Sequence, residues 1–137
     1  MPRIAMAHEI PYVATATVAE LLDLEAKVEK AMSLHGARYL HVLVPCPLGW
    51  GSAPADTVRL ARLAQRSGLF PAFEAEYGEV TSSLPIRGQV PVEEYLRPQQ
   101  RFSHLFGDPP DTEVLSQLQE LADRNIKRYG LLPEEVR

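Results

Sequence analysis

The sequence contains little cysteine, few aromatic residues and no long hydrophobic run. Its single cysteine, Cys46, excludes an internal disulfide, and only 7% of the 137 residues are aromatic. No stretch is long and apolar enough to cross a bilayer, and residues 1–6 lack the hydrophobic segment of a signal peptide. We therefore expect a protein without a membrane anchor that works in the cytoplasm, where thiols stay reduced.

Basic residues are outnumbered by acidic ones, and they do not cluster. The chain has 14 Lys and Arg against 18 Asp and Glu, which gives a net charge of −4. Nucleic-acid binding requires a positive face, so we expect no nucleic-acid partner. The Walker loop, G-x-G-x-x-G, C-x-x-C and G-x-S-x-G motifs are all absent, so no common nucleotide, redox or hydrolase signature assigns a function.

What the sequence does contain is the pattern of one α/β domain. With 45% hydrophobic residues, a chain of this length can bury a real core. Apolar spacing and breaker residues predict the following elements in order: a short helix within residues 3–10, a strand at 12–16, a helix at 18–34, a strand at 38–44, a helix capped by Ser52 or Asp56 and closing at Gly68, a strand at 71–77 with Gly78 as its turn, a short helix at 92–96, and a helix from Asp111 to Gly130.

Two of these predictions rest on specific signals. Thr17 and Glu20 form a capping-box pattern at the start of the 18–34 helix, and Gly36 suits the left-handed position after its end. Residues 38–44 are apolar on both faces, which predicts a strand covered on both sides in a mostly parallel sheet. A strand, a helix and a parallel strand then form a βαβ unit.

Proline spacing divides the chain into three expected parts. Residues 1–78 would hold the α/β domain, residues 79–110 an extended arm outside the compact core, and residues 111–137 a C-terminal helix and tail. A domain that opens on the end of a helix also suggests that further chain originally preceded Met1.

Cys46 is the main candidate for chemistry, in a loop that reads Val44-Pro45-Cys46-Pro47-Leu48-Gly49-Trp50-Gly51. Ligands of open α/β sheets gather at the carboxyl ends of strands, and Cys46 follows such an end. Three interpretations stay open: a small buried hydrophobe, a nucleophile, or one ligand of a metal or iron–sulfur centre. A thiolate-held cluster needs about four cysteines, so the other ligands would come from another segment.

Other polar residues give weaker signals. His41 is the nearest imidazole to the thiol in sequence, but five residues of strand would separate the two by roughly 16 Å. Glu74 and Glu76 alternate on one strand face, which is typical of a solvated surface. Trp50 could stack on a cofactor ring, although such a residue more often covers an interface or the edge of a core.

Four segments carry a family resemblance, in one order along the chain: residues 3–17, residues 39–51 with Pro-Cys-Pro-Leu-Gly-Trp-Gly, residues 61–71, and residues 91–105. Over roughly residues 3–105 the chain resembles the C-terminal part of the beta subunit of 2-oxoacid:ferredoxin oxidoreductases, of the pyruvate:ferredoxin oxidoreductase type. The resemblance implies part of a thiamine-diphosphate-binding, Rossmann-like fold.

The resemblance also implies a function for the complete enzyme. That family oxidatively decarboxylates a 2-oxoacid on thiamine diphosphate and Mg²⁺, and passes electrons through [4Fe-4S] clusters to ferredoxin, with coenzyme A accepting the acyl group. Cys46 matches the last ligand of the cluster nearest the thiamine. The family's C-x-x-C ligands and its Gly-Asp-Gly…Asn cofactor segment are absent here, so we expect no cofactor on this chain alone and no activity in isolation.

Alternatives to this hypothesis come from other classes of protein. One is a non-catalytic α/β interaction module, and another is a thiol enzyme with Cys46 as nucleophile. In either case, a sheet without its upstream strands leaves an edge and an apolar face uncovered, so we expect self-association. The particular 2-oxoacid cannot be read from these residues.

Overall fold

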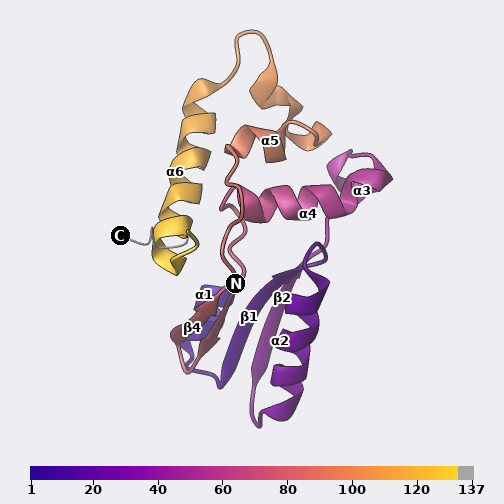
Figure 1. The fold of residues 1–137 in the computed structure, drawn as a ribbon. Helices are drawn as coiled ribbons and strands as arrows, with labels where there is room; N and C mark the ends of the chain where they lie inside the picture. The colour runs from indigo at the N-terminus through magenta and orange to yellow at the C-terminus, as the bar shows by residue number, and fades with distance from the viewer. Residues whose placement is uncertain (133–137) are drawn as a thin grey trace.

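The computed structural model describes residues 1–132 as a four-stranded mixed sheet with helices around it (Figure 1). Its elements are α1 (Pro2–Ala7), β1 (Tyr12–Thr17), α2 (Leu21–Ser33), β2 (Arg38–Leu43), α3 (Pro47–Trp50), the 3₁₀ helix η1 (Pro54–Asp56), α4 (Thr57–Arg66), β3 (Phe73–Glu76), β4 (Glu79–Ser83), α5 (Val92–Leu96), the 3₁₀ helix η2 (Gln100–Phe106) and α6 (Thr112–Tyr129). The tail predicted beyond residue 132 lies outside the described residues.

The strand order is β2-β1-β3-β4, and only one of the three pairings is parallel. β1 and β2 run parallel through six residue pairs, from Tyr12 with Arg38 to Thr17 with Leu43. β3 pairs with β1 in the opposite direction and turns back through residues 77–78 into β4. The α/β class and the β1-α2-β2 unit are therefore confirmed, whereas the prediction of a mostly parallel sheet is correct for one pair only.

Burial along the strands corrects the sequence interpretation of which strand is central. Every residue of β1 is buried, because β1 has a neighbouring strand on each side. β2 lies at the edge of the described sheet and is mostly half-buried. The prediction that residues 38–44 form a strand covered on both faces is therefore wrong for β2, which is only partly covered. The strand that is buried on both faces is β1.

Alternate residues of β1 belong to two separate core clusters, one on each face of the sheet. Tyr12 and Ala14 pack with Ala31 of α2 on one face of the sheet. Val13 packs on the other face with Phe73 and with Tyr129 near the end of α6. The rings of Phe73 and Tyr129 stack at a centroid distance of 4.4 Å, so the C-terminal end of α6 is fixed to the sheet.

A third cluster joins α4, α5, η2 and α6 in the helical half of the molecule, which lies beyond one end of the strands in Figure 1. Within the predicted arm, Val92 and Leu96 of α5 and Leu105 of η2 are buried in this cluster. The helix predicted at 92–96 is confirmed. The prediction that residues 79–110 stay outside the compact core is wrong, because β4 completes the sheet and the later residues supply apolar side chains to the helical core.

Helix ends follow local chemistry at α6 but not at α2. Asp111 caps α6, and its carboxylate accepts a hydrogen bond from the Val114 amide at 3.1 Å. α2 begins at Leu21 rather than residue 18, and neither side chain of the expected capping box caps it. Thr17 instead ends β1 as a fully buried residue, and its hydroxyl accepts from the Ala19 amide, so strand pairing takes precedence over the local capping signal.

Candidate functional site

The candidate site is the loop that leaves β2, and the structure places its thiol on the surface. Pro45 is fully buried and anchors the loop, whereas Cys46 beside it is exposed. The interpretation of Cys46 as a small buried hydrophobe is therefore wrong. An exposed thiol at the carboxyl end of a strand is accessible to another segment or molecule.

A short helix that the sequence did not predict orients this thiol. Cys46 is the N-cap of α3, and its Sγ accepts a hydrogen bond from the Gly49 amide at 3.4 Å. The Trp50 amide donates to the Cys46 carbonyl at 3.0 Å, which closes the turn. Because α3 occupies Pro47–Trp50, the following helix α4 starts only at Thr57, with Asp56 as its N-cap and no cap from Ser52.

The end of the Cys46 loop, at Gly51, packs closely against η2. Gly51 has a φ of 64°, and a Cβ at this position would lie 2.5 Å from the Cβ of Gln100. The Gln100 amide also donates to the Gly51 carbonyl at 3.3 Å. Glycine is therefore required here both for its left-handed backbone and for the close approach of η2.

Trp50 covers the contact between the loop and η2. The Arg101 guanidinium lies over its ring, with the Cζ atom 3.8 Å from the centroid, and Trp50 itself is half-buried. Among the described residues, this places Trp50 in an intramolecular contact, in line with the expected role at the edge of a core. Arg101 gave no signal in the sequence, because nothing local distinguishes it from the other scattered basic residues.

His41 does not join the thiol. Its ring makes edge contacts with Tyr39 and Phe70, at centroid distances of 6.2 and 5.7 Å. It lines a cavity of about 240 Å³ together with Thr15 and Tyr129. The described residues hold no hydrogen bond between His41 and Cys46, so the two do not form a thiol–imidazole pair here.

Glu74 and Glu76 are more than a solvated face. Lys30 of α2 bridges both carboxylates, with N–O distances of 3.0 and 2.8 Å, and the Tyr12 hydroxyl donates to Glu74 at 2.6 Å. Burial of Glu74 opposes its ionisation, but hydrogen bonds from Tyr12, Ser82 and Lys30 outweigh it and hold the pKa of Glu74 below its usual value. With only 18% of its side chain exposed, Glu74 contradicts the interpretation of a solvated surface.

Residues 1–132 contain no group of three or more His, Cys, Asp or Glu side chains that could hold a metal ion. Cys46 nonetheless has the features of a single ligand: an exposed sulfur, a fixed direction, and one backbone N–H bonded to it. One thiol can supply only one corner of a thiolate-held cluster, so any further ligands would have to come from outside this part of the chain. No helix in this part of the chain is both long and apolar enough to span a membrane.

Sequence comparison identifies relatives that match most of this chain. Pyruvate synthase subunit PorB of Methanosarcina barkeri is 43% identical over 131 residues, which cover 96% of this chain and 44% of that protein. PorB of Methanocaldococcus jannaschii is 40% identical over the same share of this chain and 42% of its own length. The ketoisovalerate oxidoreductase subunit VorB of Pyrococcus abyssi is 39% identical over 114 residues, 82% of this chain and 36% of that protein.

No protein-family model matches the chain. The matched relatives carry two substrate names, pyruvate and ketoisovalerate, and the chain spans less than half of the length of each. The aligned region nevertheless covers 96% of this sequence in both PorB subunits. The chain therefore belongs with the PorB-type beta subunits of pyruvate:ferredoxin oxidoreductase-like enzymes, as the counterpart of part of such a subunit.

Proposed function

We propose that this chain is the C-terminal portion of a 2-oxoacid:ferredoxin oxidoreductase beta subunit, and that Cys46 ligates a [4Fe-4S] cluster in the complete enzyme. The observation that carries the proposal is the exposed, oriented thiol at the end of β2. The identity to PorB and VorB subunits over 82–96% of the chain supports the assignment of the enzyme class.

In this proposal the complete enzyme decarboxylates a 2-oxoacid on thiamine diphosphate and Mg²⁺, and transfers the acyl group to coenzyme A. The cluster supplies electron transfer toward ferredoxin when it is bound. Other segments or subunits provide the remaining cluster ligands and the thiamine site, so the chain alone binds none of these groups. We place the assembled enzyme in the cytoplasm, where Cys46 stays reduced.

The contribution of this chain is to position the sulfur. Pro45 anchors the loop in the core, while the Gly49 amide donates to the sulfur. Hydrogen bonds to cluster sulfurs and the degree of solvent exposure both tune the reduction potential of such centres. We therefore assign the α3 turn a positioning role for the ligand, and Arg101 a supporting role through its contact with Trp50.

The test uses a longer form of the subunit that restores the length found in the relatives. Cys46→Ser should lower iron and sulfide content and abolish the electron paramagnetic resonance signal of one cluster. Leu48→Ser, a change at a residue that is 97% exposed in the same loop, is the matched control and should retain every cluster. Full cluster content in Cys46→Ser would overturn the ligand assignment.

A second candidate function, a non-catalytic interaction module, is favoured by two surface features. Leu21, Val28 and Met32 form an exposed apolar stripe along α2, with exposed fractions of 66%, 42% and 76%. β2 also lies at the edge of the sheet in the described residues, where it can pair with another strand. Both surfaces support self-association of the isolated chain, and in the proposed enzyme both would be covered by the rest of the assembly.

A further inference from the structure

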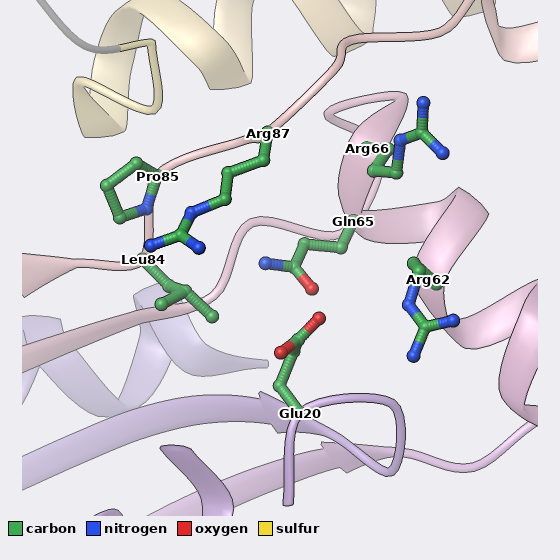
Figure 2. Close-up of a pocket in the computed structure, with 7 residues that line it drawn as sticks. All are labelled: Glu20, Arg62, Gln65, Arg66, Leu84, Pro85 and Arg87. Atoms are coloured by element: carbon green, nitrogen blue, oxygen red, sulfur yellow. The ribbon is translucent and has the colours of Figure 1, made fainter. Parts of the chain in front are cut away.

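A cavity of about 390 Å³ lies between α4, the turn before α2 and the segment after β4. It is lined by Glu20, Arg62, Gln65, Arg66, Leu84, Pro85 and Arg87, which Figure 2 shows around a common space. None of these residues belongs to the Cys46 loop, so the cavity is a separate feature of the fold. Its polar lining comes from three segments that are far apart in the sequence.

The cavity is positively charged in a protein whose net charge is −4. Three arginines and one carboxylate, that of Glu20, are among the lining residues, which leaves a formal charge of +2. Within residues 1–132 none of the three arginines forms an ion pair with a carboxylate. This surplus of unpaired arginine favours an anionic ligand with two negative charges.

Helical spacing and one backbone contact fix the arginine side of the cavity. Arg62, Gln65 and Arg66 stand at positions i, i+3 and i+4 of α4, so they share one face of the helix. The Arg66 Nε donates to the Gly88 carbonyl at 2.5 Å and holds the segment after β4 against α4. Arg87 lines the space from that segment, and in Figure 2 its guanidinium lies beside Leu84 and Pro85.

Gln65 adds an unsatisfied acceptor to the charged lining. Only 5% of this residue is exposed, and its Oε1 atom is buried without a hydrogen-bond partner. Figure 2 shows this oxygen directed toward the carboxylate of Glu20, so two acceptors face each other. A buried acceptor without a partner is unfavourable, and a ligand that brings an O–H or N–H group would satisfy it.

We propose that this cavity binds a phosphoryl dianion that also carries a hydroxyl donor, either hydrogenphosphate itself or a phosphate ester with a neighbouring hydroxyl. The guanidinium groups of Arg62 and Arg87 bind the phosphoryl oxygens, because the planar fork of arginine matches this group. The hydroxyl donates to the Gln65 Oε1 atom. Sulfate has the same shape and charge but no proton at neutral pH, so it leaves the Gln65 oxygen without a donor and binds less tightly.

Isothermal titration of the 137-residue chain with sodium phosphate and with sodium sulfate, at equal ionic strength, tests this proposal. Phosphate should bind at least about tenfold more tightly than sulfate. Arg62→Gln and Arg87→Gln should each weaken phosphate binding by about tenfold. Arg59→Gln is the matched control, since Arg59 lies on the same helix, pairs with Asp56 and is outside the cavity.

A further variant distinguishes the preference for phosphate over sulfate from the general attraction of the positively charged cavity for anions. Gln65→Leu keeps the approximate shape but removes the acceptor, so it should erase most of the preference for phosphate over sulfate. Circular dichroism of each variant verifies the fold. Equal affinities for phosphate and sulfate in the unaltered chain, or arginine variants that bind like Arg59→Gln, would overturn the proposal.

Two further ligands identify the source of the phosphoryl group. Glycerol 3-phosphate carries hydroxyls and methyl phosphate does not, so tighter binding of glycerol 3-phosphate than of inorganic phosphate points to an ester, and the reverse points to the free ion. Methyl phosphate binding as tightly as both would contradict the role of the donor. Cys46→Ser should leave phosphate binding unchanged, because this site does not depend on the cluster proposal.

Discussion

The guanidinium of Arg101 lies directly over the ring of Trp50, with 3.8 Å between its Cζ atom and the ring centroid. The Arg101 Nε donates to the Gln99 side chain at 3.0 Å, and Gln99 is fully buried. The loop that carries Cys46 is thus held by a residue from a segment about fifty positions later in the chain. This contact connects the candidate site to the helical core.

Replacing Arg101 should loosen the Cys46 loop. Arg101→Gln removes a cation–π contact of about 0.5–1 kcal/mol and uncovers one face of Trp50. Because Trp50 is the only tryptophan, its fluorescence emission should shift to longer wavelength as water reaches the ring. Arg97→Gln, which removes the similar contact of Arg97 with Phe106, is the control and should leave the emission unchanged. If the emission spectrum of Arg101→Gln is the same as that of Arg97→Gln, Arg101 does not cover Trp50 in solution.

The Glu74 network should make stability dependent on acid. The pKa of Glu74 is lowered in the folded state, so its contribution is complete above the ordinary value of 4.5 and is lost as the pH falls through the folded pKa. Urea unfolding between pH 3 and pH 6 should show this decline. Glu74→Gln should flatten it, whereas an equally steep decline in the variant would assign the acid sensitivity to other carboxylates.

Asp23 should stabilise the fold by pairing with the buried ammonium group of Lys27. Only 3% of the Lys27 side chain is exposed, and its Nζ donates to the Thr15 carbonyl at 2.9 Å and to Asp23 at 2.7 Å. Asp23→Asn should lower the free energy of unfolding by about 1–3 kcal/mol, because it leaves a buried ammonium without a counter-charge. Lys27→Met removes that charge and should cost less. The opposite order in urea unfolding would contradict this explanation.

The apolar stripe of α2 should control self-association of the isolated chain. Leu21→Lys combined with Met32→Lys places charge on two side chains that are 66% and 76% exposed, and should shift the chain toward monomer. Ser33→Lys adds a charge on the same helix away from the stripe, so it should retain the larger species. Light scattering at high protein concentration distinguishes these results. A chain that is monomeric before any substitution would overturn the expected association.

Local patterns predicted the elements well where their signals were short in range. The apolar spacing from Val114 to Ile126, with Asp111 before it and Gly130 after it, specified α6 and both of its ends. The capping pattern of Thr17 and Glu20 was wrong at α2, because pairing of Thr17 with Leu43 extends β1 to that residue. β4 was missed, since its exposed, polar sequence carries no apolar alternation and gains its structure by pairing with β3.

Of the two candidate sites, local sequence signals identified the Cys46 loop but not the arginine-lined cavity. Pro-Cys-Pro followed by Gly and Trp identified the Cys46 loop, because proline and glycine restrict the backbone locally and the resemblance names the thiol. Arg62 and Arg87 could not be recognised as neighbours, since 25 residues separate them and only the packing of the segment after β4 on α4 brings them to one cavity.

The sequence by itself determined the α/β class, the amphipathic helices and the position of the thiol after a strand, because these features depend on periodicity and on neighbouring residues. Only the tertiary structure decided that β1 is the central strand, that Cys46 is exposed while Pro45 is buried, and that Arg101 covers Trp50. These outcomes depend on which distant side chains meet when the apolar faces are buried. A local pattern does not contain that information.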